Sequence, residues 1–89
     1  MGTRPVILLT RNEGIRIRAN ITVAPVTTRI RSIPTEVELG PNDGLPQKCV
    51  ANLDSLQTIR KALLRERIGI LSASKLAAVE EGIRFALGL

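Results

Sequence analysis

The sequence contains no histidine, tryptophan or tyrosine, and only one phenylalanine, one cysteine and one methionine. Without histidine, the chain cannot carry a Ser/His or Cys/His catalytic pair. Cys49 has no second cysteine with which to form an intramolecular disulfide, which fits a reducing compartment and the role of a small buried residue. With a single aromatic side chain, a core must be built from Leu, Ile, Val and Ala.

Long apolar runs are absent too. The run Val6–Leu9 is too short for the hydrophobic region of a signal peptide, and nothing approaches a membrane span. The sequence also has no glycine-rich phosphate loop and no cluster of metal ligands, so we expect no cofactor and no metal. A soluble, cytoplasmic protein is therefore expected, and 89 residues predict one domain, residues 1–89.

Acidic residues are scarce in the first third of the chain. Residues 1–31 contain six arginines and a single acid, Glu13, whereas the remaining chain carries equal numbers of basic and acidic residues. The net charge of +5 is therefore concentrated at one end of the sequence. A localised basic surface is typical of a protein that binds a polyanion, and a basic solvated face is the alternative interpretation.

The hydrophobic pattern predicts several short strands. Apolar, β-branched or alternating runs predict strands at residues 5–10, 20–26 (with alternation beginning at Ile15), 35–39, 48–56 with 57–59 as a continuation, and 67–71. The polar stretch "RNEG" (11–14) predicts a turn. Pro25 cannot donate to a ladder, so the strand at 20–26 is expected to be bulged or exposed at that residue.

The last part of the chain changes to a helical period. Apolar residues recur at Leu76, Val79, Ile83 and Leu87. This spacing predicts a helix over about 73–87, with Ser72 as its N-cap and Gly88 at its end. Together, these elements predict a small, strongly curved β-sheet or barrel with one C-terminal helix packed on it.

The stretch "VAPVTTRIR" (23–31) places two threonines at the end of an apolar strand, directly before two arginines. Threonines there are usually β-formers or local caps, and an arginine before a strand, such as Arg4, is usually a surface residue. Together they fit RNA cleavage by the RNA's own 2′-hydroxyl, in which the protein orients the phosphate and stabilises its developing charge. A guanidinium and a hydroxyl can do this without metal or histidine.

The carboxylates are mostly scattered singly. Asp54 follows an apolar run and precedes Ser55, so it stands at a strand end, where an aspartate is more often a turn former than a functional group. Glu36 and Glu38 fall on one face of a predicted strand. We interpret that pair as part of a solvated face.

Several blocks in sequence order carry a family resemblance. They are "RPVILLTR", "VAPVTTRIR", "TEVEL", "CVANLDSLQTI", "RIGIL" and the terminal helix. From Arg4 to the end, this set resembles the MazF/PemK/Kid family of toxin–antitoxin ribonucleases. The resemblance implies a mainly β fold with α, an SH3-like small barrel of the MazF/PemK/CcdB type with a C-terminal helix, which forms a homodimer. It also implies a metal-independent endoribonuclease (mRNA interferase) that cuts single-stranded RNA and is neutralised by a cognate antitoxin.

The resemblance also implies roles for individual residues. Arg4 matches the catalytic arginine of the family's "RP" motif, and Thr27 matches its catalytic threonine. The RNA-binding positions that it implies are Arg11, Thr28, Arg29, Arg31, Asp54 and Ser55. No residue is assigned as general base.

This chain departs from the family pattern at its start, where members have a further strand before the "RP" motif. We therefore expect a domain that is short at its N-terminus, with an exposed pairing edge. A catalytically impaired member that only binds antitoxin or nucleic acid is the alternative function. The gyrase-poisoning branch of the same superfold is a third reading, and the arginine-rich start with the "RP…TT" pair favours RNA over gyrase.

Overall fold

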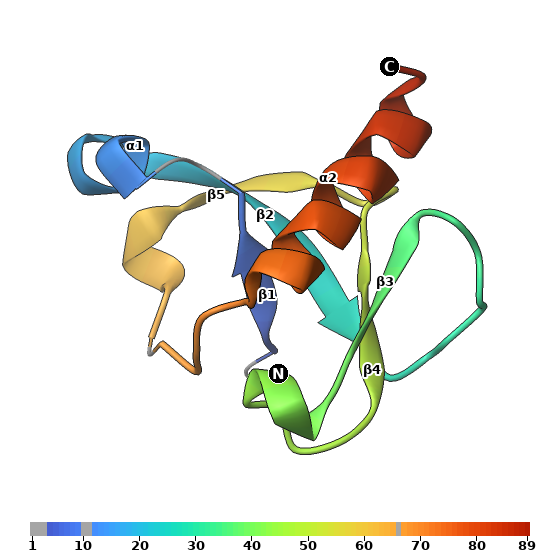
Figure 1. Cartoon of the computed structure of the whole chain (residues 1–89). Coiled ribbons are helices and arrows are strands. Elements are labelled where there is room, and N and C mark those ends of the chain that lie inside the picture. The colour runs from blue at the N-terminus through green and yellow to red at the C-terminus, as the bar shows by residue number, and fades with distance from the viewer. Residues whose placement is uncertain (1–3, 10–11, 66) are drawn as a thin grey trace.

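The computed structural model describes residues 4–9, 12–65 and 67–89, and its centre is the eight-residue strand β2 (Asn20–Thr27). Strand β1 (Val6–Leu8) pairs with one edge of β2, and strands β4 (Cys49–Asn52) and β5 (Gln57–Arg60) pair with its other edge. Strand β3 (Glu36–Leu39) pairs with β4. All four pairings are antiparallel, and the strongly curved sheet that results is the predicted one (Figure 1).

Pro25 marks the point at which β2 changes partner. β5 pairs with β2 up to Val23, and β4 pairs with it from Val26 onward. The Val26 N–H donates to the carbonyl of Pro5 at 3.2 Å, so by strand alternation the Pro25 nitrogen faces the opposite edge of β2. On that edge, the segment between β4 and β5 does not pair with β2. No ladder hydrogen bond is therefore lost because Pro25 has no N–H. The bulge or exposure expected at Pro25 is not what the structure has: Pro25 is half-buried and paired with Val6, and β2 changes partner there instead.

One face of the sheet forms the core beneath the helix α2 (Ala73–Leu87). Figure 1 shows α2 running diagonally across the sheet, and Val79 and Ile83 pack into the core from the helix. The sheet contributes Ile7, Ala24, Val26, Val37, Leu39, Cys49 and Ala51 to this core. Because successive residues of a strand point to opposite faces, the neighbours of these residues point away from α2. Thr27, Glu36 and Asn52 are among them.

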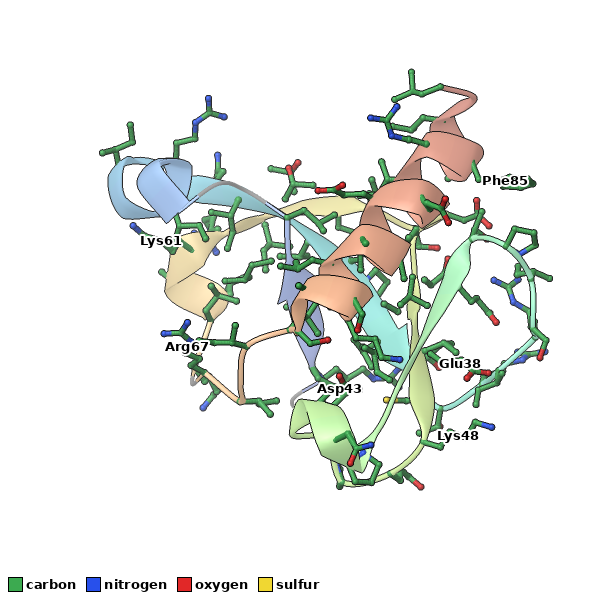
Figure 2. The ribbon with its side chains drawn as sticks, viewed as in Figure 1. Glu38, Asp43, Lys48, Lys61, Arg67 and Phe85 are labelled. Atoms are coloured by element: carbon green, nitrogen blue, oxygen red, sulfur yellow. The ribbon has the colours of Figure 1, made fainter. Side chains whose placement is uncertain are left out.

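The predicted caps of α2 are confirmed. Ser72 accepts a hydrogen bond from the Lys75 N–H at 3.2 Å, and Gly88 adopts a left-handed conformation with φ 73°. The predicted apolar face is only partly buried, because Leu76 and Leu87 are 49% and 60% exposed. Phe85 is also exposed and lies on the outer side of the helix (Figure 2). Among the described residues, no helix is long and apolar enough to cross a membrane.

The turn predicted at 11–14 was wrong for the described residues, which form the short helix α1 (Asn12–Ile17). The Arg18 N–H donates to the Gly14 carbonyl at 2.9 Å, and the Lys61 ammonium donates to the Ile15 carbonyl at 2.7 Å. Lys61 belongs to the 3₁₀ turn η2 (Lys61–Leu63) and lies beside α1 (Figure 2). The Lys61 ammonium satisfies a backbone carbonyl that such a short helix leaves without an intrahelical partner. Because Lys61 is far from α1 in the sequence, no local pattern predicts this contact.

The strand predicted at 67–71 was also wrong. These residues pair with no strand, and Ile68 and Ile70 are 51% and 74% exposed. Ile68 instead lies against the turn that follows the 3₁₀ helix η1 (Pro41–Asp43), since a Cβ built on Gly44 would be 3.2 Å from the Ile68 carbonyl oxygen. Apolar residues do alternate in this segment, but no strand among the described residues pairs with it.

Candidate active site

Arg4 and Thr27 come together through the register of β1 on β2. Val6 pairs with Pro25, and the Pro5 carbonyl accepts the Val26 N–H at 3.2 Å. The next residue outward is Arg4 on one side and Thr27 on the other, so this register, continued one residue beyond Pro5 and Val26, leads from Arg4 to Thr27. Arg4 is exposed and Thr27 is half-buried, and both residues stand at the same end of the β1–β2 ladder.

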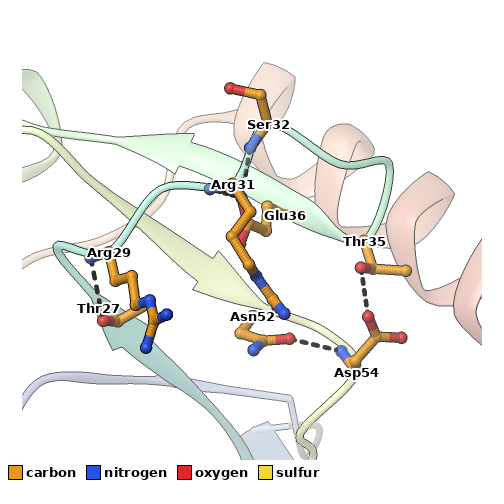
Figure 3. Close-up of polar contacts among 8 residues, drawn as sticks. All are labelled: Thr27, Arg29, Arg31, Ser32, Thr35, Glu36, Asn52 and Asp54. Atoms are coloured by element: carbon orange, nitrogen blue, oxygen red, sulfur yellow. Dashed lines mark hydrogen bonds and ion pairs between the residues drawn. The ribbon is translucent and has the colours of Figure 1, made fainter.

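The Thr27 hydroxyl shapes the loop that follows it. Its oxygen accepts a hydrogen bond from the Arg29 N–H at 3.2 Å, which closes a local turn around the exposed Thr28 (Figure 3). No described residue accepts the hydroxyl proton of Thr27. That proton is therefore available to an acceptor such as a phosphate oxygen, and Arg29 is exposed beside it.

Glu36 holds the far end of the same loop. Its Oε1 accepts hydrogen bonds from the backbone N–H groups of Arg31 at 2.8 Å and Ser32 at 2.9 Å, and its Oε2 accepts one from Arg31 Nε at 3.1 Å (Figure 3). The Glu36 side chain is 2% exposed, whereas that of Arg31 is 49% exposed. The solvated-face interpretation was therefore wrong for Glu36 and holds for Glu38, which is exposed.

These contacts set the ionisation of Glu36. Burial alone would raise the pKa of its carboxyl, but the hydrogen bonds from Arg31 and Ser32 and the charge of Arg31 outweigh burial and lower that pKa. Because the folded-state pKa is below the unfolded-state value, the stability from this carboxylate is present above the unfolded pKa. It is lost as the pH falls through the folded pKa.

We therefore expect Glu36→Gln to remove a pH-dependent part of the stability. The difference in free energy of unfolding between the wild type and Glu36→Gln should be largest at neutral pH and should shrink below about pH 5. Urea unfolding at several pH values between neutral and strongly acidic measures it. Glu38→Gln, on the same strand but exposed, is the control and should differ little from the wild type at any pH. A difference for Glu36→Gln that does not change with pH would contradict the assignment.

Asp54 is tied to the loop between β2 and β3. Its Oδ2 accepts a hydrogen bond from the buried Thr35 hydroxyl at 2.5 Å, and its N–H donates to the Asn52 Oδ1 at 2.9 Å. The Leu53 N–H donates to the Thr35 carbonyl at 2.8 Å, which joins the two loops a second time. These bonds give Asp54 the turn-forming role, and the exposed Ser55 follows it in the same bend.

The predicted site residues are thus brought together in part. Arg4 and Thr27 stand at one end of the β1–β2 ladder, and Thr28, Arg29 and Arg31 lie in the loop that follows Thr27. Asp54 and Ser55 lie on the next loop, and the hydrogen bond to Thr35 connects that loop to the first one. Arg11 lies outside the described residues.

The residues that hold the site together were missed by the sequence interpretation. Glu36, Ser32 and Thr35 support the two loops, yet the sequence analysis assigned a functional role to none of them, although Thr35 and Glu36 stand in the "TEVEL" block. The sequence feature that could have indicated this supporting role is the pair of opposite charges, Arg31 and Glu36, on either side of a short loop that contains Pro34. Among residues 4–9, 12–65 and 67–89, no group of three or more Cys, Asp or Glu residues is placed to hold a metal ion.

Comparisons with known proteins decide the family. A family model described as "PemK-like, MazF-like toxin of type II toxin-antitoxin system" matches residues 1–87. This chain belongs to that toxin family. "Endoribonuclease MazF3" of Mycobacterium tuberculosis (strain CDC 1551 / Oshkosh) is 42% identical over 86 residues, which are 97% of this chain and 84% of the relative.

Solved structures of the MazF family have the same fold. "Mycobacterium tuberculosis toxin MazF-mt6" superposes with a TM-score of 0.93 at 42% identity, over 97% of this chain and 87% of the other. "Endoribonuclease in complex with its cognate antitoxin from Mycobacterial species" gives a TM-score of 0.88 at 31% identity, over 99% of this chain and 84% of the other. The predicted MazF/PemK family, mainly β fold with a C-terminal helix, and endoribonuclease toxin of a toxin–antitoxin system are confirmed.

Proposed function

We propose that this MazF-family toxin cuts single-stranded RNA without a metal ion, through attack of a 2′-hydroxyl on the adjacent phosphate. The observation that carries the proposal is the register of β1 on β2, in which the Pro5 carbonyl accepts the Val26 N–H and the next residues outward are Arg4 and Thr27. The Thr27 hydroxyl donates a hydrogen bond to a non-bridging phosphate oxygen, and the Arg4 guanidinium stabilises the negative charge that develops on the phosphorane. Because a guanidinium is a permanent cation, Arg4 stabilises charge and orients the leaving 5′-oxygen rather than removing a proton.

The loop beyond β2 supplies the RNA-binding surface in this proposal. Thr28, Arg29 and Arg31 are exposed beside the catalytic pair and bind the phosphates that flank the scissile bond. Asp54 and Ser55 on the adjoining loop contact the RNA on the other side. Arg11 extends the same basic surface in the sequence.

A cognate antitoxin is the second proposed partner. One similar structure is described as an endoribonuclease in complex with its cognate antitoxin, and another as a MazE–MazF complex from Deinococcus radiodurans. By analogy, we propose that an antitoxin neutralises this chain in the cytoplasm, where mRNA is available. We also propose that residues 1–89 act as one toxin domain and as a homodimer, because a domain of this size buries little surface alone.

A cleavage assay on a long single-stranded RNA in EDTA tests the reaction, with the ends of the products mapped. The proposal requires cuts at a short recurring motif that leave 2′,3′-cyclic phosphate and 5′-hydroxyl ends. RNA that is bound without new ends would indicate the binding-only alternative. Intact RNA together with trapped, cleaved DNA in a parallel gyrase assay would indicate a gyrase poison.

Two substitutions at Thr27 test its role in that assay. Thr27→Val keeps the shape of the side chain but removes the hydroxyl, and we expect a loss of cleavage of about 10²-fold. Thr27→Ser keeps the hydroxyl and should stay within about tenfold of the wild type. Equal cleavage by Thr27→Val and the wild type would show that the hydroxyl does not contact the reacting phosphate.

A further inference from the structure

A nearly buried carboxylate at the edge of an RNA-binding surface needs an explanation. A negative charge beside the RNA backbone opposes binding, and the sequence places Glu36 five residues after Arg31. Yet the Glu36 side chain is 2% exposed, and both of its oxygens accept hydrogen bonds from the loop that begins after Thr27. The charge of the Glu36 carboxylate is therefore neutralised by Arg31, and the carboxylate faces the loop and not the solvent. Its role is to stabilise the loop.

The backbone at Ser32 shows what the carboxylate stabilises. Ser32 has φ 56°, in the left-handed region, and it is the only residue other than glycine with positive φ among the described residues. This conformation is unfavourable for a residue with a side chain. The Ser32 N–H donates to Glu36 Oε1 at 2.9 Å, so the carboxylate holds the turn in a conformation that serine would otherwise avoid.

The same carboxylate fixes the direction of the Arg31 side chain. Glu36 Oε2 accepts from Nε, and neither Nη group of Arg31 has a hydrogen-bond partner among the described residues. Figure 3 shows the guanidinium extending from Glu36 toward Asn52, whose backbone pairs with Glu36 across the sheet. The two Nη groups therefore remain for a phosphate and are held in one orientation.

We propose that Glu36 is a positioning residue for RNA, which holds the turn at Arg31–Ser32 so that Arg29 and Arg31 are preorganised to bind phosphates. The loop is then fixed at both ends. At one end the Thr27 hydroxyl oxygen accepts a hydrogen bond from the Arg29 N–H, and at the other end the Glu36 carboxylate accepts hydrogen bonds from the N–H groups of Arg31 and Ser32. Preorganised cations bind a polyanion without the entropic cost of ordering the loop. This role rests on the proposed function, because it requires that the loop binds RNA.

Binding of an RNA that cannot be cut separates this role from catalysis. The probe is a random-sequence, single-stranded RNA with 2′-O-methyl groups, which lacks the attacking hydroxyl. Glu36→Ala should weaken its binding about tenfold and lower the salt dependence of binding by about one phosphate contact. Glu38→Ala removes an exposed carboxylate from the same face of the same strand and should leave binding unchanged or slightly tighter. If Glu36 acted only as a negative charge, its removal would tighten binding, and that result would overturn the proposal.

Restoring the turn by another route gives a second test. Glycine adopts φ near 56° without strain, so Ser32→Gly in the Glu36→Ala background should recover about threefold of the lost affinity. Ser32→Gly alone should bind as the wild type does. The absence of any recovery in the double variant would overturn the proposal, because a general loss of packing would not be repaired at Ser32.

A further variant keeps the test decisive if Glu36→Ala does not fold. Ser32→Val leaves Glu36 in place but disfavours the left-handed turn, so it should weaken RNA binding in the same way. Normal binding by Ser32→Val would count against the proposal. In cleavage assays, Glu36→Ala should raise KM while kcat at saturating RNA stays within about threefold. A wild type that binds but does not cut RNA would contradict the proposed function and leave the binding test of Glu36 intact.

Discussion

Arg4→Ala is expected to reduce RNA cleavage about 10²- to 10³-fold without a change in fold. In the proposed reaction, Arg4 is the cation nearest the phosphorane, because the register of β1 on β2, continued one residue beyond Pro5 and Val26, leads from Arg4 to Thr27. Arg4 is exposed and lies two residues before the start of β1, so its side chain contributes little to packing. The measurement is the single-turnover rate on a long single-stranded RNA in EDTA, with urea unfolding as the test of fold.

Two further variants separate the role of Arg4 from that of general positive charge. Arg4→Lys keeps the charge but loses the bidentate fork of the guanidinium, so we expect an intermediate loss of about tenfold or more. Arg67→Ala removes an exposed arginine from the segment between η2 and α2, away from the end of β2, and should cut as the wild type does (Figure 2). If Arg4→Ala and Arg67→Ala had equal effects, Arg4 would be only part of the basic surface.

Local sequence patterns correctly predicted those elements whose structure is determined by their own residues. The helix α2 has an apolar period, a serine N-cap and a terminal glycine, and all three are present in the structure. The missing N–H of Pro25 marked the place of an interruption, but the sequence predicted a bulge or exposure there, and not the change of partner that the structure has. The helix α1 was missed because its anchor, the Lys61 ammonium on the Ile15 carbonyl, comes from 46 residues away. Tertiary contacts of this kind override the local alternation of Ile and Arg.

The candidate site was predictable for the residues that stand in family motifs. Arg4 and Thr27 were named from the "RP" motif and the "VAPVTTRIR" block, but only the strand register indicates that they stand at the same end of the β1–β2 ladder. Glu36 was misread because alternation along a strand gives the face of a side chain, not its burial. The loop before it folds back over that face, and Arg31 covers the carboxylate. Thr35 was missed because its partner, Asp54, is 19 residues away in the sequence.

The contact between Gly82 and Leu53 links α2 to the loop that carries Asp54. Leu53 is 1% exposed and immediately precedes Asp54. Glycine is poor in the middle of a helix, costing about 1 kcal/mol relative to alanine, so Gly82 needs a packing reason. A Cβ built on Gly82 would overlap Leu53 Cδ1 and would lie 3.7 Å from the Pro34 carbonyl oxygen. The glycine therefore allows α2 to approach the sheet closely enough for Leu53 to fill the space beneath it.

Leu53→Ala is accordingly expected to lower the free energy of unfolding by about 2–5 kcal/mol, because it empties a well-packed site in the core. Gly82→Ala alone should destabilise the protein, since an overpacking cost of about 1–3 kcal/mol exceeds the gain in helix propensity. In the Leu53→Ala background the clash is gone, so Gly82→Ala should become neutral or stabilising, with a coupling of about 0.5–3 kcal/mol in the double-mutant cycle.

Urea unfolding of the four proteins in this cycle measures the coupling. Gly69→Ala is the matched control, since a Cβ there would meet only the Asp43 carbonyl oxygen, at an ordinary distance of 3.4 Å. Its effect should be similar in the wild type and in the Leu53→Ala background, because Gly69 does not touch this contact. Additive effects of Leu53→Ala and Gly82→Ala would show that the helix does not rest on Leu53. A large coupling would establish that α2 packs against Leu53 at the position of Gly82.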